Sequence, residues 1–150
     1  MKLKHLTKRF FGALSKKAPA VSEIAQVKSI LSVREFDLWS AMPPMDQRHS
    51  IVVMRRFVGL HASATKFEIR AALLHDAGKT ASNLGVIQRV IATLVGRVSK
   101  RFSDYHEHEQ LGAQMLQKID SHEITWQLVA GESKPELQTA LQALRQADDI

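Results

Sequence analysis

Apolar residues along this chain recur at the three- and four-residue spacing of amphipathic helices, and strict alternation of apolar and polar residues is almost absent. The pattern predicts an all-α fold with helices over residues 22–30, 33–41, 45–61, 66–76, 83–98, 105–119, 122–130 and 135–148. The adjacent prolines in "AMPPMDQ" separate the second helix from the third, because proline lacks an amide donor. Three hydroxyl residues are each followed three positions later by a glutamate, the spacing of a capping box: Ser32 with Glu35, Thr65 with Glu68, and Ser133 with Glu136.

The composition is that of an ordinary globular protein. Hydrophobic residues make up 45% and charged residues 24% of the 150 positions, and one domain of this size buries roughly two thirds of its unfolded surface. The chain has no cysteine, which excludes disulfides, thiolate nucleophiles and cysteine-ligated zinc. We expect a single cytoplasmic domain over residues 21–150.

The formal charge of +6 lies entirely within residues 1–20, which hold six basic residues and no acidic one. Residues 21–150 hold 15 basic and 15 acidic residues, so we do not expect the domain to bind nucleic acid. The basic segment also carries apolar residues at roughly helical spacing. It is interpreted as a helix docked on the domain, a weak anchor for an anionic lipid surface, or a flexible tail. The strongly apolar helix over 83–98 is expected in the core or between copies of a homo-oligomer.

Several polar residues lie at the ends of apolar segments, where their side chains are expected to face the interior. They are His49 before "SIVV", the doublet His75 and Asp76 after "IRAALL", and Asp148 after "LQTALQALRQA". Burying an unpaired carboxylate is prohibitively costly, and a shared divalent ion would remove that cost. Nitrogen and oxygen ligands without sulfur favour iron, manganese, cobalt, nickel or magnesium, and are compatible with zinc. The alternative is that these residues are helix caps and core polar groups.

The order of these residues resembles the H…HD…D pattern of the HD superfamily of metal-dependent phosphohydrolases. The segment "LLHDAGK" is similar to that family's LLHDIGK, "HEQLGAQML" to its HPEIGAEIL, and "LRQADDI" to its closing helix, in which an aspartate follows an alanine. The resemblance covers roughly residues 45–150 and is greatest to small, stand-alone bacterial HD-domain proteins. It implies a helical bundle with a metal site in a central cleft and a phosphate-containing small molecule, such as a nucleotide, as substrate.

The resemblance implies that one divalent ion is held by four residues: His49, His75, Asp76 and Asp148. Asp149 is the alternative to Asp148, one position further along the same helix. Members of the family with two metals usually carry a His-His pair after the helix that follows "HEQLGAQML". This chain has Ala130, Gly131 and Glu132 at that place, which favours a single ion.

Further roles follow for the residues around these ligands. Asp76 would orient an attacking water, and His108 would protonate the leaving group. Lys79 would bind a phosphate oxygen, or would merely complement a helix dipole with Gly78 as the stop signal. Arg48 is expected to contact the substrate. Asp46 would support His49, or would simply cap the helix that begins after the prolines.

The sequence therefore favours a metal-dependent phosphohydrolase acting on a phosphomonoester or phosphodiester. One alternative is a non-catalytic HD domain that senses a metal or nucleotide or serves as an interaction module. Another is an adaptor for nucleic acid or a membrane surface built around residues 1–20.

Overall fold

The computed structural model describes residues 17–81 and 100–150, with side chains described up to Lys79 and again from His108. Its elements are α2 (Val21–Ile30), α3 (Val33–Ser40), α4 (Pro44–Leu60), α5 (Lys66–Leu74), α6 (Gly78–Ala81), α8 (Lys100–Lys118), α9 (Glu123–Ala130), the 3-10 helix η1 (Pro135–Leu137) and α10 (Gln138–Asp148). The described ranges contain no strand, which confirms the predicted all-α class. Most of the predicted basic arm and the predicted helix over 83–98 lie outside these ranges.

Local capping chemistry explains two of the helix starts. The hydroxyls of Ser32 and Thr65 accept hydrogen bonds from the amides of Glu35 and Glu68, whose carboxylates accept in turn from the amides of Ser32 and Thr65. The third predicted capping box, at Ser133, is wrong. The chain enters η1 one residue later, with Lys134 in the N-cap position and no side-chain cap, and the regular α-helix begins only at Gln138.

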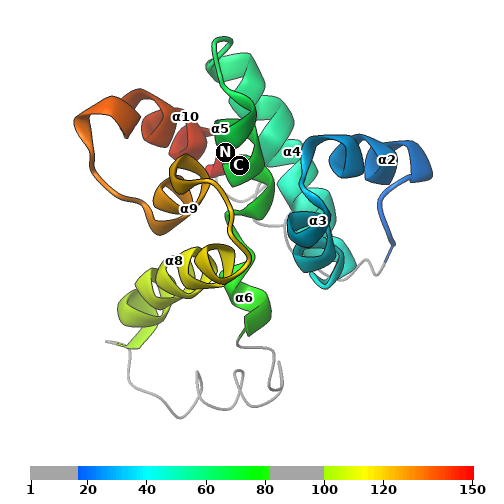
Figure 1. Cartoon of the computed structure of the whole chain (residues 1–150), viewed down its shortest axis with the longest axis horizontal. Helices are drawn as coiled ribbons and strands as arrows, with labels where there is room; N and C mark the ends of the chain where they lie inside the picture. Colours follow the sequence, from blue (N-terminus) through cyan, green and yellow to red (C-terminus); the bar gives the residue numbers. More distant parts are fainter. Residues whose placement is uncertain (1–16, 82–99) are drawn as a thin grey trace.

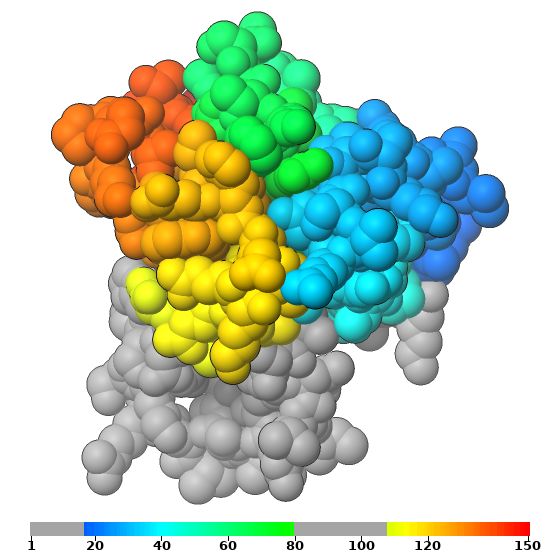
Figure 2. All heavy atoms as spheres, viewed as in Figure 1, coloured from blue at the N-terminus to red at the C-terminus, as the bar shows by residue number. Residues whose placement is uncertain are grey.

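Helix α5 forms the centre of the fold. Its last four residues are completely buried, and α2, α3, α4 and α9 all pack against it. Figure 1 shows α5 between α2 and α3 on one side and α9 and α10 on the other. In Figure 2 the N-terminal helices and the C-terminal helices likewise lie on opposite sides of the green segment that contains α5.

A buried polar network holds α3 against the rest of the bundle. The Glu35 side chain is only 1% exposed, and its carboxylate accepts hydrogen bonds from the Ser32 amide at 2.9 Å and the Ser121 hydroxyl at 2.9 Å. Arg70 on α5 places Nε 3.5 Å from the same carboxylate and donates to the Ile30 carbonyl at 2.8 Å. The network ties α3 to α5 and to the turn after α8.

Within the residues described, no helix combines the length and apolar character needed to cross a lipid bilayer.

Candidate metal centre

His49, His75 and Asp148 bring ligand atoms from three different elements to one place. His49 Nε2 lies 2.8 Å and His75 Nε2 lies 3.3 Å from Asp148 Oδ1. The three ligand atoms all lie within 4.8 Å of one another, so the cluster could hold a metal ion. Two ligands at right angles, each about 2.1 Å from an ion, would lie about 3.0 Å apart, which is close to the observed spacings.

The end of α5 positions the His75 ring. The α-helix ends at Leu74 rather than at the predicted residue 76, and tight turns follow, with the amide of Ala77 donating to the Leu74 carbonyl. His75 Nδ1 lies 2.7 Å from the Ala72 carbonyl oxygen, to which it can only donate. In the neutral ring this hydrogen bond leaves Nε2 as the lone-pair nitrogen, facing the other ligand atoms.

Asp76 lies beside this cluster and links it to Lys79. Its Oδ2 atom lies 3.4 Å from His75 Nε2, 4.0 Å from His49 Nε2 and 3.1 Å from Lys79 Nζ. Gly78 does not end a helix, as one interpretation of the sequence held, but begins α6, on which Lys79 lies. Asp76 and Lys79 meet because the chain turns tightly between α5 and α6.

Charge within the cluster shifts the proton affinity of its groups. Burial alone would lower the pKa of His75, but Asp76, Asp148 and the Ala72 carbonyl raise it to about 9. Burial would raise the pKa of Asp148, yet the hydrogen bonds from the two imidazoles hold it well below its usual range. Burial would lower the pKa of Lys79, and the neighbouring Asp76 carboxylate raises it instead. A divalent cation entering here would replace protons as the neutralising charge.

Arg56 fixes the end of α10 that carries Asp148. Its Nε donates to the Ala147 carbonyl at 3.0 Å, and its Nη2 donates to the Gln146 carbonyl at 3.4 Å. These carbonyls belong to the last turn of α10, where a cation also complements the helix dipole. Arg56 lies seven residues after His49 on α4, and therefore on the same face. One face of α4 thus contributes the candidate ligand His49 and holds the end of α10 that carries the candidate ligand Asp148.

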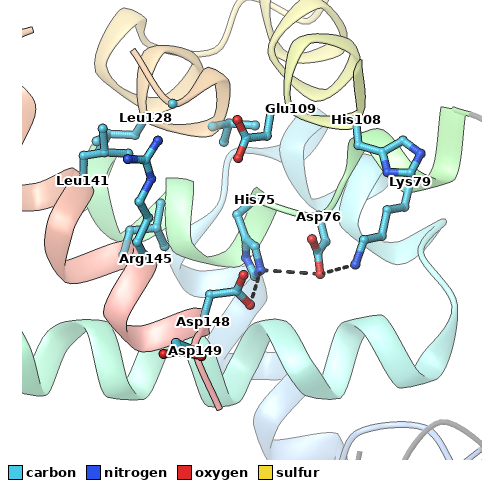
Figure 3. Close-up of a pocket in the computed structure, with 13 residues that line it drawn as sticks. His75, Asp76, Lys79, His108, Glu109, Leu128, Leu141, Arg145, Asp148 and Asp149 are labelled. Atoms are coloured by element: carbon cyan, nitrogen blue, oxygen red, sulfur yellow. Dashed lines mark hydrogen bonds and ion pairs between the residues drawn. The ribbon is translucent and has the colours of Figure 1, made fainter. Parts of the chain in front are cut away.

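A cavity of about 320 Å³ opens beside the cluster. His75, Asp76 and Asp148 line it together with Lys79 and His108. Figure 3 shows Lys79 and His108 on the same side of the cavity, next to Asp76. A small molecule in this cavity would therefore meet two residues of the candidate metal cluster, His75 and Asp148, together with an ammonium group and an imidazole.

Two glycines bring the Lys79 and His108 segments together. A Cβ atom added to Gly78 would overlap the carbonyl oxygen of His108 and would lie 2.8 Å from the amide nitrogen of Gly112. The backbones of α6 and α8 therefore touch at this crossing, which only glycine permits. Neither glycine was expected to have this role from the sequence.

The remaining predicted site residues, Asp149, Asp46 and Arg48, do not contact the two imidazoles in the way that Asp148 does. Asp148, not Asp149, contacts the two imidazoles, although both aspartates line the cavity. Asp46 does not cap α4, because Pro43 is the N-cap residue. Burial raises the pKa of Asp46, and the charges of Lys79 and Asp76 act on its carboxylate, so Asp46 lies near the site. Arg48 is half-buried on α4 and does not line the cavity, so its contact with substrate stays a prediction.

Glu109 and Arg145 also line the cavity and were not singled out from the sequence. Glu109 directly follows His108, and Arg145 lies three residues before Asp148, so each shares a helix with a motif residue. Helical spacing from the motif would have placed Arg145 on the same face as Asp148.

Comparison of the chain with models of protein families, with curated proteins and with solved structures finds no significant match.

Proposed function

We propose that this protein is an HD-domain phosphohydrolase that uses one divalent ion to hydrolyse a phosphoester. The observation that carries the proposal is the convergence of His49, His75 and Asp148 beside a cavity that also holds Asp76, Lys79 and His108. The order of these residues along the chain is that of the H…HD…D pattern.

The donor set fits a divalent cation. It offers two imidazole nitrogens and carboxylate oxygens, and the Ala72 carbonyl orients His75 as second-sphere groups do in metal sites. Iron, manganese, cobalt, nickel and magnesium suit such ligands, and zinc is also compatible. His49, His75 and Asp148 would hold the ion. Asp76, whose Oδ2 lies near both imidazoles and near Lys79 Nζ, would be the fourth ligand.

A divalent ion at this place supplies Lewis acidity, which makes water a nucleophile near neutral pH and polarises a phosphoryl oxygen. Asp76, through its second oxygen, would orient the attacking water. Lys79, whose raised pKa keeps it charged, would bind a non-bridging phosphate oxygen. His108 would donate a proton to the leaving oxygen.

Elemental analysis of the purified full chain, followed by calorimetric titration with Mn²⁺, tests the ion. Asp148→Asn should reduce Mn²⁺ affinity at least tenfold, because it removes a charged ligand of nearly the same shape. Asp149→Asn is the matched control, since it changes the adjacent aspartate outside the cluster. Equal Mn²⁺ affinity in the two variants would contradict the assignment.

Hydrolysis is tested on a panel of phosphomonoesters and phosphodiesters with the metal-loaded protein. Loss of the general acid in His108→Gln should slow alkyl phosphates by about 10²–10⁴-fold and p-nitrophenyl phosphate much less, because nitrophenolate leaves without a proton. Lys79→Met should lower kcat/KM for both leaving groups while retaining the metal. A panel without turnover in a fully loaded protein would instead support a non-catalytic sensor.

A further inference from the structure

A second cavity, of about 290 Å³, lies at the opposite end of α5 from the metal cluster. Glu68 in the first turn of α5, Glu123 in the first turn of α9 and Glu136 on η1 line it. Glu68 lies seven residues before His75, which corresponds to about 10 Å along a helix. The second cavity is therefore separate from the site proposed for hydrolysis, and its volume is near the lower end of the usual range for small-ligand pockets.

Negative charge dominates the lining of this second cavity. The lining holds three carboxylates and one ammonium group, that of Lys134, whose Nζ lies 3.6 Å from Glu132 Oε2. Glu68 Oε1 accepts a hydrogen bond from the Thr65 amide, and Glu68 Oε2 lies 3.0 Å from His61 Nε2. Each of these two oxygens keeps a lone pair for another donor. The second cavity therefore attracts a cation.

Gln127 adds a neutral acceptor to the same lining. This residue is only 5% exposed, and it lines the second cavity. Its Nε2 donates to Glu123 Oε1 at 2.7 Å, and none of the described residues donates a hydrogen bond to its Oε1. That oxygen is not sealed in the core, so it borders the cavity. An acceptor on so deeply buried a side chain needs a hydrogen-bond donor, which a ligand can supply.

The spread of the carboxylates favours an organic cation over a metal ion. Among the described residues, only His49, His75 and Asp148 bring three ligand atoms within 4.8 Å of one another, so the three glutamates do not. Ile124 and Leu137 add apolar side chains to the lining. An alkylammonium group has three donors and no acceptor, and its carbon chain would pack against these two side chains.

We propose that the second cavity binds an aliphatic diamine. One ammonium group is held in the deep part of the cavity, by Gln127 Oε1 and by the carboxylate of Glu68, whose side chain is 12% exposed. The carbon chain lies against Leu137, and the second ammonium group meets Glu136, which is exposed at the edge. Binding of this kind needs neither the metal ion nor the hydrolysis proposed above.

Chemical-shift titrations of the full chain test the class of ligand, at about 0.15 M NaCl to screen weak surface attraction. The probes are 1,4-diaminobutane, butylamine, which has one ammonium group, and 1,4-butanediol, which has none. We expect the diamine to bind at least about tenfold more tightly than butylamine, because its second ammonium group adds a charge-assisted contact, and we expect the diol not to bind. Ca²⁺ that binds this cavity as tightly as the diamine, or a diamine that shifts no resonance of the cavity residues, would overturn the proposal.

Three variants and a control connect the binding to the residues. Glu136→Gln and Gln127→Met should each weaken diamine binding about tenfold, since each removes a hydrogen bond in which one partner is charged. Lys134→Met should strengthen binding several-fold, because it removes a competing cation. Glu23→Gln, on α2 and outside the cavity, should leave the affinity unchanged. Wild-type affinity in both Glu136→Gln and Gln127→Met would exclude this cavity as the diamine site.

Asp148→Asn separates diamine binding from the metal site. The substitution removes a candidate metal ligand from the cluster at the other end of α5, so the affinity for the diamine should stay at its wild-type value. This result is expected whether or not the protein holds a metal ion or hydrolyses phosphoesters. Loss of diamine binding in Asp148→Asn would place the diamine at the metal cluster and reject the second cavity.

Discussion

Replacing Gly78 by alanine should destabilise the protein, because α6 and α8 touch at this residue. The added Cβ would overlap the His108 carbonyl oxygen and lie 2.8 Å from the Gly112 nitrogen, whereas ordinary contacts of this kind begin at 3.4 Å. Both contacted atoms belong to the backbone and cannot rotate away, so the helices must separate. Overpacking of this kind costs about 1–3 kcal/mol.

Gly59 provides a matched control for this substitution. It lies inside α4, and a Cβ atom there would have no neighbour within 4 Å. Gly59→Ala should therefore stabilise the protein by about 0.5–1 kcal/mol, because alanine loses less backbone entropy in a helix. The two alanine variants should shift the unfolding free energy in opposite directions.

Urea unfolding and thermal denaturation of both variants would measure these shifts. For a chain of this size, 1 kcal/mol corresponds to roughly 2–4 °C in Tm, so Gly78→Ala should lower Tm by several degrees. Separation of α6 from α8 would also move Lys79 away from His108, and hydrolysis should fall even where the variant is folded. A Gly78→Ala protein as stable as Gly59→Ala would refute the close crossing of α6 and α8.

Three further perturbations test other parts of the structure. Arg56→Met should weaken Mn²⁺ binding about tenfold, because it releases the end of α10 that carries Asp148. Arg55→Met, at the neighbouring position, should leave Mn²⁺ binding unchanged. Calorimetric titration of both variants would measure the difference. Glu35→Gln should cost about 2–4 kcal/mol in urea unfolding, because the Glu35 carboxylate is buried against Arg70. Glu23→Gln, in a pair that is partly exposed to solvent, should cost less than about 1 kcal/mol. In the metal-free protein, His75 binds its proton more tightly when folded than when unfolded, so its pairing stabilises the fold below pH 6.5 and this contribution is lost as the pH rises through about 9. Urea unfolding across this range should show the decline, and a stability that rises toward pH 9 would contradict it.

The helices were largely predictable because their signals are local. The hydroxyl and glutamate pairs at Ser32 and Thr65 begin helices where the sequence indicates, since both partners lie within one turn. The same spacing at Ser133 was misleading, because Pro135 starts a 3-10 turn with Lys134 at its cap. The predicted end of α5 was two residues late, because nothing local marks the tight turns through Ala77.

The convergence of His49, His75 and Asp148 was predictable because each follows or begins an apolar face that must turn inward. The role of Arg56 was not predictable, because Arg56 holds the end of α10 only through hydrogen bonds to carbonyls 90 and 91 residues away. Glu109 and Arg145 were missed for a similar reason, since they meet only across the Gly131 backbone. Local periodicity shows which face of a helix is inside, but not which distant charge will meet it there.

The pair formed by His49 and Asp148 joins positions 99 residues apart. An ion shared by these two side chains would act as a cross-link that closes a loop covering most of the described chain, and every route to global unfolding would have to open it. Its binding energy would then add directly to folding stability, by about 2.7 kcal/mol at an ion concentration one hundred times Kd. Because the ligand set is complete only after α10 docks on α4, the ion could bind tightly only to chains in which this long-range contact has formed.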